Sequence, residues 1–146
     1  MRILLDTNLL VRAAITPTGL ARKLLRSVEE REAHILILSS HLLSEVADVL
    51  HQPRIQQRWP LSEAEIETYC RYLSRVGQEV PLDPLPPVIA DPKDQPVIEA
   101  AVAGQADVIC TSDAHFYKPP AKDFLDERRI SVLTDRALLM LLENEP

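Results

Sequence analysis

Four carboxylates in this 146-residue chain occupy positions where an α/β protein can bring them together. Asp6 ends the first apolar segment, in MRILLDTNL, and Asp113 follows the apolar segment ADVICT. Glu45 falls in the first turns of the helix expected after HILILS, and Asp94 opens the helix expected before ADVICT. In a parallel sheet the carboxyl ends of all strands lie on one side, where open α/β folds bind ligands. We therefore expect Asp6, Glu45 and Asp113 to meet, and Asp94 to join them if its helix starts on that side.

Carboxylates placed this closely predict a metal site. They repel one another, and some take up protons unless a cation lies between them. Oxygen ligands without histidine or cysteine spacing favour Mg²⁺ or Mn²⁺ over zinc. Such a site activates water and stabilises the pentavalent phosphorus of phosphodiester cleavage. The open alternative is that each acid only caps a helix, as strand-end Asp residues commonly do.

Helical phase separates the candidate acids from their neighbours. In the helix expected over residues 41–50, Glu45 lies at the edge of the apolar face and Asp48 points almost directly away from it. A carboxylate at the rim of a buried face needs a partner or a cation, whereas Asp48 can be solvated. Within DPKD, both Asp91 and Asp94 are candidates. The phase of the following helix favours Asp94.

Apolar and amphipathic segments alternate along the chain and define the elements that position these acids. Strands are expected at residues 2–5, 34–39, 106–111 and 130–133, with a weaker candidate at 79–82. Helices are expected at residues 7–14, from a Thr18 cap to the charged run at 29–32, and at 41–50, 62–76, 97–103 and 135–143. Residues 51–59 read as a polar, basic connector, with Trp59 as a packed anchor or an exposed stacking residue. Strands that are apolar throughout are typical of parallel sheets. The pattern predicts a single domain over residues 1–146 with a three-layer α/β/α fold and a central, mainly parallel sheet.

Composition limits the partners of the chain. Apolar residues make up 46% and charged residues 26%, and the net charge is −6. That charge argues against nucleic-acid binding through overall electrostatics, but it allows a local basic patch or bound metal ions. Cys70 and Cys110 are far apart without a CxxC spacing and are expected to be reduced thiols, which fits a cytoplasmic protein. No apolar run approaches the ~20 residues of a membrane span. We expect the N-terminal segment to be a strand and not a signal peptide, because Asp6 interrupts it.

Four segments, in this order, resemble the PIN domain: LLDTNLLVRA, LLSEVADVL, DPKDQPVIEAAVAG and ADVICTSDAHF. They are most similar to the VapC-like group, the PIN-family toxins of bacterial toxin–antitoxin pairs. The resemblance spans nearly the whole chain. It implies a Mg²⁺- or Mn²⁺-dependent endoribonuclease that cleaves single-stranded or structured RNA with metal-activated water. It also implies an antitoxin protein as partner, a possible homodimer and a cytoplasmic location.

The resemblance also assigns roles to individual residues. It implies that the metal ligands are Asp6, Asp94 and Asp113, with Glu45 bound directly or through water. Residues that orient these carboxylates are then Asn8, together with Thr111 or Ser112. Thr7 and Asn8 are left to cap the first helix.

Two further groups of residues are assigned with alternatives. Many relatives carry an acidic or other polar residue where this chain has His115, which either contacts a phosphate or a bound water or is an ordinary surface histidine. Candidate phosphate contacts around the site, each of which can equally be solvated charge, are Arg12, Arg22, Lys23, Lys118 and Lys122.

Other functional classes fit the sequence less well. A catalytically silent PIN-fold binding module that acts through a protein partner is the main alternative, and the presence of all four acids counts against it. A phospho-accepting receiver domain needs an acidic pair after the first strand, where this chain has Asp-Thr-Asn. A haloacid-dehalogenase-type phosphatase needs Asp-x-Asp there, and Asn8 replaces the second Asp.

Overall fold

A five-stranded sheet forms the centre of the computed structural model, which describes residues 1–146. The strand order is β3-β2-β1-β4-β5, and all four neighbouring pairs are parallel. The strands are β1 (Arg2–Leu5), β2 (Ile35–Leu38), β3 (Gly77–Glu79), β4 (Val108–Cys110) and β5 (Ser131–Leu133). The predicted α/β fold is confirmed, and its sheet is wholly parallel. The weak strand predicted at residues 79–82 begins two residues earlier, directly where the preceding helix ends at Gly77.

Eight α-helices and two short 3₁₀ helices surround the sheet. The α-helices are α1 (Thr7–Ile15), α2 (Leu20–Glu29), α3 (Ser40–His51), α4 (Pro53–Arg58), α5 (Glu63–Val76), α6 (Gln95–Ala103), α7 (Ala121–Glu127) and α8 (Asp135–Glu143). The 3₁₀ helices are η1 (Pro92–Asp94) and η2 (Ala114–Tyr117). No helix has both the length and the apolar character that crossing a bilayer requires.

Three helix predictions need correction. The connector predicted at residues 51–59 contains α4, which starts at Pro53 because the fixed φ of proline suits a first helical position. Helix α7 was not predicted, since its short segment is mostly charged. Helix α2 is capped by Gly19, which makes no side-chain cap bond, and not by Thr18.

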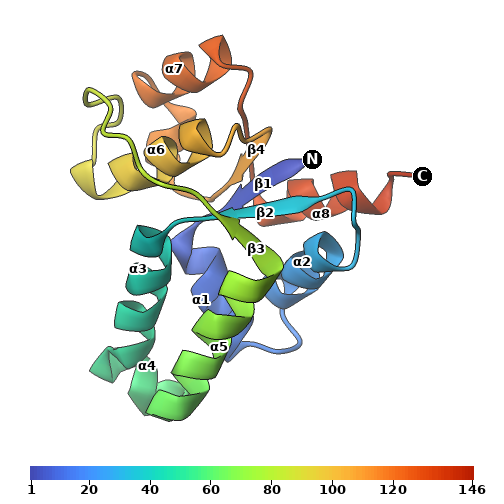
Figure 1. Ribbon diagram of the computed structural model, residues 1–146, viewed down its shortest axis with the longest axis vertical. Helices are drawn as coiled ribbons and strands as arrows, with labels where there is room; N and C mark the ends of the chain where they lie inside the picture. The colour runs from blue at the N-terminus through green and yellow to red at the C-terminus, as the bar shows by residue number, and fades with distance from the viewer.

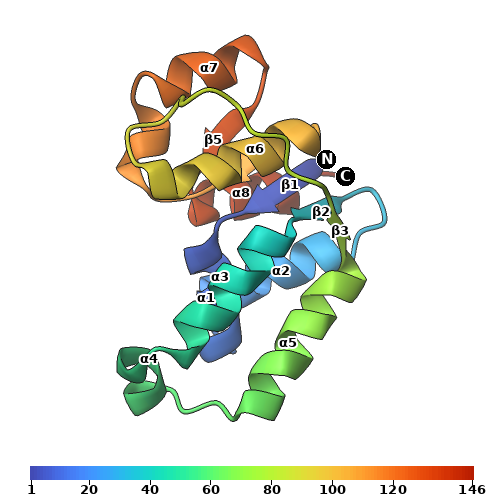
Figure 2. The ribbon, with the colours of Figure 1, turned by 60° about the vertical axis from the view of Figure 1, so that its left-hand side comes forward.

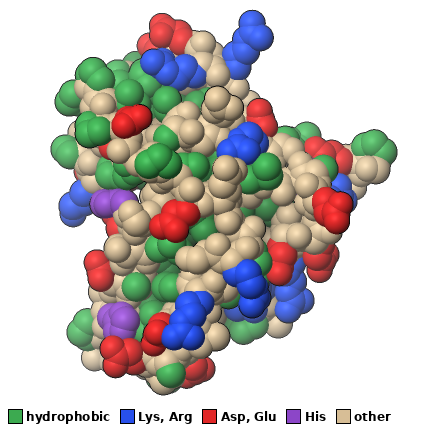
Figure 3. Space-filling view, in the orientation of Figure 1, with side chains coloured by type: hydrophobic (Ala, Val, Ile, Leu, Met, Phe, Trp, Pro, Cys, Tyr) green, Lys and Arg blue, Asp and Glu red, His purple; other side chains and the backbone are tan.

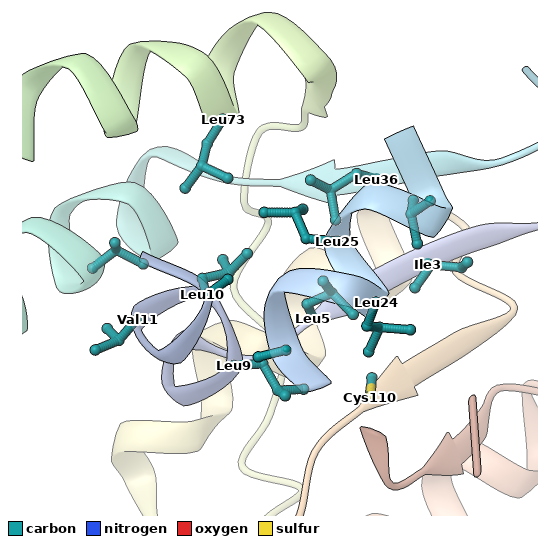
Figure 4. Close-up of a cluster of buried hydrophobic side chains, with 14 of the residues drawn as sticks. Ile3, Leu5, Leu9, Leu10, Val11, Leu24, Leu25, Leu36, Leu73 and Cys110 are labelled. Atoms are coloured by element: carbon teal, nitrogen blue, oxygen red, sulfur yellow. The ribbon is translucent and has the colours of Figure 1, made fainter. Parts of the chain in front are cut away.

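The sheet separates two apolar cores, so the molecule has three layers. Ile3 and Leu5 face a core built with α1, α2, α5 and α8, whereas Leu4 faces a second core built with α6 and α7. Figures 1 and 2 show α6 and α7 on one side of the sheet and α1, α2 and α5 on the other. Side chains of β1, β2, β4 and the covering helices gather in the first core, as Figure 4 shows. In β1, β2 and β4, alternate residues are therefore buried on opposite faces, which explains the unbroken apolar runs.

The strand order places a topological switch point between β1 and β4. From β1 the chain adds β2 and β3 on one side, whereas β4 and β5 lie on the other. The two strands stay paired up to their carboxyl ends, where the backbone N–H of Asp6 donates to the carbonyl of Cys110 at 3.1 Å. Open α/β sheets bind ligands in the crevice beyond such a point. Asp6 and Asp113 follow the two strands that flank it.

Candidate active site

A pocket of about 240 Å³ opens at the carboxyl edge of the sheet, and we call it the acidic pocket. All four predicted acids line it: Asp6, Glu45, Asp94 and Asp113. The other lining residues are Thr7, Asn8, Asp48, Val49, Lys93, Val97 and Phe116. With Asp48, which helix phase was expected to point away, five acids therefore meet in one cavity. The role of the four predicted acids as metal ligands stays a prediction.

Asp6 both caps a helix and lines the acidic pocket. Its side chain is the N-cap of α1, with Oδ1 accepting from the backbone N–H of Leu9 at 2.9 Å, so the prediction that Thr7 and Asn8 do the capping is wrong. Its Oδ2 accepts from the hydroxyl of Thr111. Asp6 is only 8% exposed, and this burial raises its pKa even though both hydrogen bonds favour the ionised form.

Thr111 connects the two acids that follow strands β1 and β4. It is fully buried, and its Oγ1 accepts from the backbone N–H of Asp113 at 3.1 Å while donating to Asp6. The carboxylate of Asp113 in turn accepts from the backbone N–H of His115 at 2.9 Å. One hydroxyl thus links the carboxylate of Asp6 to the backbone of Asp113.

Glu45 reaches the pocket from α3. Ser39 caps this helix through the N–H of Leu42 at 3.1 Å, which starts the helix at the carboxyl edge of the sheet. Oε2 of Glu45 accepts from the hydroxyl of Thr7 at 2.8 Å, and Oε1 lies 3.2 Å from Nε2 of His41. Neither partner was predicted from sequence, although the i, i+4 spacing of His41 and Glu45 indicates such a contact.

Asp94 has an oxygen that no donor satisfies. Its Oδ2 is buried without a hydrogen-bond partner. Burial, followed by the neighbouring Asp113 and Asp91, raises the pKa of Asp94 to about 7. A buried carboxylate oxygen without a donor is stable only with a proton or a cation. The environment of Asp94 therefore fits a divalent cation.

Asp91 and Asp94 occupy different places. Asp91 does not line the acidic pocket, and its Oδ1 accepts from the N–H of Lys93 at 3.0 Å. However, one ligand atom each of Asp91, Asp94 and His115 lies within 4.8 Å of the other two, an arrangement that can also hold a metal ion. Asp94 belongs both to the acidic pocket and to this second cluster. The phase of the following helix favoured Asp94 over Asp91 as the site residue.

Of the remaining predicted site residues, some lie beside the acids and one lines a neighbouring pocket. His115 faces the acids, since its Nδ1 lies 3.2 Å from Oδ1 of Asp113 and 3.7 Å from Oδ2 of Asp94. Asn8 is exposed and lines the acidic pocket. Ser112 is exposed and lines a neighbouring pocket instead.

Most of the predicted phosphate contacts have other partners. Lys23 pairs with Glu143 at 2.7 Å and Lys122 pairs with Asp126 at 3.0 Å. Arg22 donates to the carbonyl of Ala13, and Arg12 lies 3.5 Å from Asp135. Lys118 is exposed. The cation that lines the acidic pocket is Lys93, which was not predicted as a phosphate contact although it lies inside DPKD.

Replacing Thr111 tests how its hydroxyl supports the site. In Thr111→Val the carboxylate of Asp6 loses a donor in a buried place, so we expect the free energy of unfolding at pH 7 to fall by about 1–3 kcal/mol. The pKa of Asp6, followed by carboxyl ¹³C NMR, should rise further. Thr111→Ser keeps the hydroxyl and should leave that pKa near the wild-type value. Equal Asp6 pKa values in the Val and Ser variants would contradict the role of the hydroxyl.

The raised pKa of Asp94 predicts a pH-dependent stability in the metal-free protein. Between the unfolded pKa of 3.8 and the folded pKa of about 7, the folded state holds a proton that the unfolded state releases. The free energy of unfolding should therefore fall as the pH rises through this range. Urea unfolding in EDTA should show a smaller fall for Asp94→Asn than for wild type. A difference between the two proteins that stays constant from pH 4 to pH 8 would refute the shift.

Comparison with known protein families agrees with this geometry. A family model described as the PIN domain matches residues 2–115, a span that includes all four acids and His115. The search of curated proteins gives no significant match. PIN domains are typically metal-dependent nucleases, and the match confirms the predicted family without resolving the toxin subgroup. With an acidic pocket at the switch point of a parallel sheet and a family match over most of its length, this chain belongs to the PIN domain family.

Proposed function

We propose that this protein is a metal-dependent endoribonuclease that hydrolyses phosphodiester bonds in single-stranded or structured RNA. The convergence of Asp6, Glu45, Asp94 and Asp113 on one pocket carries the proposal. The family supports the same reaction class, because PIN domains are typically nucleases. A silent binding module has no need of an unsatisfied buried carboxylate oxygen, which costs stability.

The donor set fits Mg²⁺ or Mn²⁺. Every acid that lines the pocket offers oxygen atoms, and neither cysteine lies there. Hard divalent cations prefer such ligands. In this proposal Asp6, Asp94 and Asp113 hold the cation, and Glu45 binds it directly or through a water. When bound, one or two such ions activate water and neutralise charge on the phosphoryl group.

Neighbouring side chains hold these ligands in place. The hydroxyl of Thr111 orients Asp6, and the hydroxyl of Thr7 orients Glu45. His115 places a ring nitrogen beside Asp113 and Asp94. Partners of this kind fix ligand geometry and usually affect activity when removed.

Cleavage of single-stranded RNA tests the proposal directly. We expect cleavage with Mg²⁺ or Mn²⁺ and none with EDTA. Asp6→Asn should reduce the rate by about 100-fold or more while circular dichroism shows an intact fold, because loss of a ligand charge weakens metal binding. Asp83→Asn, the same change at an exposed loop position, is the matched control and should keep wild-type activity. Metal-independent cleavage or full activity of Asp6→Asn would overturn the mechanism.

Metal binding has a readout that does not depend on activity. Mn²⁺ should raise the thermal unfolding midpoint of wild type more than that of Asp6→Asn, since a ligand of the folded state stabilises it. The effect should be weaker at pH 5.5 than at pH 7.5, because the cation must displace the proton that Asp94 holds at the lower pH. Metal stabilisation without cleavage of any RNA would favour the binding module.

We further propose that the nuclease is a VapC-like toxin with an antitoxin partner, acts in the cytoplasm and forms a homodimer. The resemblance of its four motifs to that group supports this assignment. Expression in a bacterial host should arrest growth, and Asp6→Asn should not. Co-expression of a small protein encoded beside it should restore growth. Normal growth on expression of a nuclease shown to be active would instead indicate a free-standing processing enzyme.

A further inference from the structure

A second pocket, of about 510 Å³, adjoins the acidic one, and we call it the arginine pocket. The two pockets share Asn8 and Val49, and Ser112 lines the second while its neighbour Asp113 lines the first. The two pockets therefore adjoin at Asn8 and Val49. Asn8 belongs to α1, and Val49 belongs to α3.

Three arginines line this pocket, and no acidic residue does: Arg12, Arg54 and Arg58. Arg54 and Arg58 form no ion pair with a carboxylate. Arg12 lies 3.5 Å from Asp135, and the side chain of Arg12 is 46% exposed. On the face shown in Figure 3, in contrast, acidic and basic side chains are interspersed. In a chain of net charge −6, three guanidinium groups around one cavity without an acid mark a local site for an anion.

Trp59 gives the pocket a stacking plane. The guanidinium of Arg58 lies 4.8 Å from the centre of the Trp59 ring. Trp59 itself is partly buried against the first core, so it holds the arginine from a fixed position. Arginine planes and aromatic rings are the groups on which proteins stack unpaired bases.

The arginine pocket extends from the acids toward α4. Helices α1 and α3 both start at the carboxyl edge of the sheet, where the acidic pocket lies, and α4 follows the far end of α3 (Figures 1 and 2). Asn8 and Ser112 mark the end of the arginine pocket near the acids, and Arg54, Arg58 and Trp59 belong to the α4 end. A strand with one phosphate among the acids can therefore continue along the arginines.

We propose that the arginine pocket binds the nucleotides next to the scissile phosphate of a single-stranded RNA. Arg12, Arg54 and Arg58 contact backbone phosphates, and one unpaired base stacks on the plane that Trp59 and Arg58 form. This inference rests on the proposed ribonuclease function. A cavity of this volume holds a small segment of an extended strand and not a duplex. An acidic peptide fits the arginine pocket less well than single-stranded RNA. It has no base to stack on Trp59 and Arg58, and it carries no cation that would offset repulsion from the neighbouring acids.

Binding without catalysis provides the test. In the Asp6→Asn background, and with EDTA, fluorescence anisotropy of a labelled single-stranded RNA measures affinity whether or not the wild type is a nuclease. We expect Arg54→Ala with Arg58→Ala to weaken binding by about 10-fold or more at low salt. The slope of log affinity against log salt should also become shallower by about 1.4, since each lost phosphate contact of a single strand accounts for about 0.7.

A matched double variant controls for net charge. Arg71→Ala with Arg75→Ala removes two arginines from α5, which line a different pocket. Affinity and salt slope should stay at the level of the background protein. Equal losses in both double variants would mean that only overall charge matters and would overturn the proposal.

Variants of Trp59 test base stacking, and competitors test which class of ligand the pocket binds. Trp59→Ala should weaken binding by about 5-fold or more, and Trp59→Phe, which keeps the fold and a ring, should recover most of the loss. Duplex RNA, or a polyglutamate of equal charge, should not displace the labelled strand. Displacement by either would overturn the assignment to single-stranded RNA. If the wild type cleaves RNA, Arg54→Ala with Arg58→Ala should raise KM and leave kcat within about 3-fold, since phosphate contacts outside the reacting centre act mainly on binding.

Discussion

The contact between Asp6 and Thr111 fixes the geometry on which the rest of the site depends. It joins the ends of β1 and β4 at the switch point of the sheet, and the same hydroxyl accepts from the backbone of Asp113. The other oxygen of Asp6 caps α1. A single carboxylate therefore caps one helix and, through Thr111, is linked to the backbone of the other strand-end acid. Because it is almost fully buried, its charge has to be balanced inside the pocket and not by bulk water.

The distribution of charge around this centre follows from that requirement. Arginines among the acids would form ion pairs with them and compete with a cation. In the structure Arg12, Arg54 and Arg58 line the next pocket instead, whereas the cation that lines the acidic pocket is Lys93. Among these arginines, Arg12 lowers the pKa of Asp6, but burial outweighs this effect and the pKa stays raised. Repulsion among closely placed acids raises their affinity for a divalent ion or a proton. The adjacent arginines supply the attraction for a polyanion that the acids cannot.

Much of this arrangement could be predicted from sequence because parallel sheets place all strand ends on one side. The apolar runs gave the strands, and the positions of Asp6 and Asp113 after them gave two of the acids. Helix phase favoured Glu45 and Asp94 over their neighbours. What could not be predicted depends on tertiary contacts between distant segments: the bond from Thr7 to Glu45 spans 38 residues. Helix α4 was missed because it is short and polar, with only Ile55 buried. Without that helix, Arg54 and Arg58 appeared as connector charges.

The two pockets also divide chemistry from recognition. Every RNA offers the same phosphodiester, so acids that hold a cation against it cannot distinguish one sequence from another. Discrimination has to come from groups that meet the bases, and unpaired bases are read by stacking and by hydrogen bonds to their edges. Near the acidic pocket, the structure provides such groups in the Arg58–Trp59 pair and in the exposed amide of Asn8. Changes at Arg58 and Trp59 should therefore alter which RNA is bound while leaving the reaction itself intact, because neither residue lines the acidic pocket.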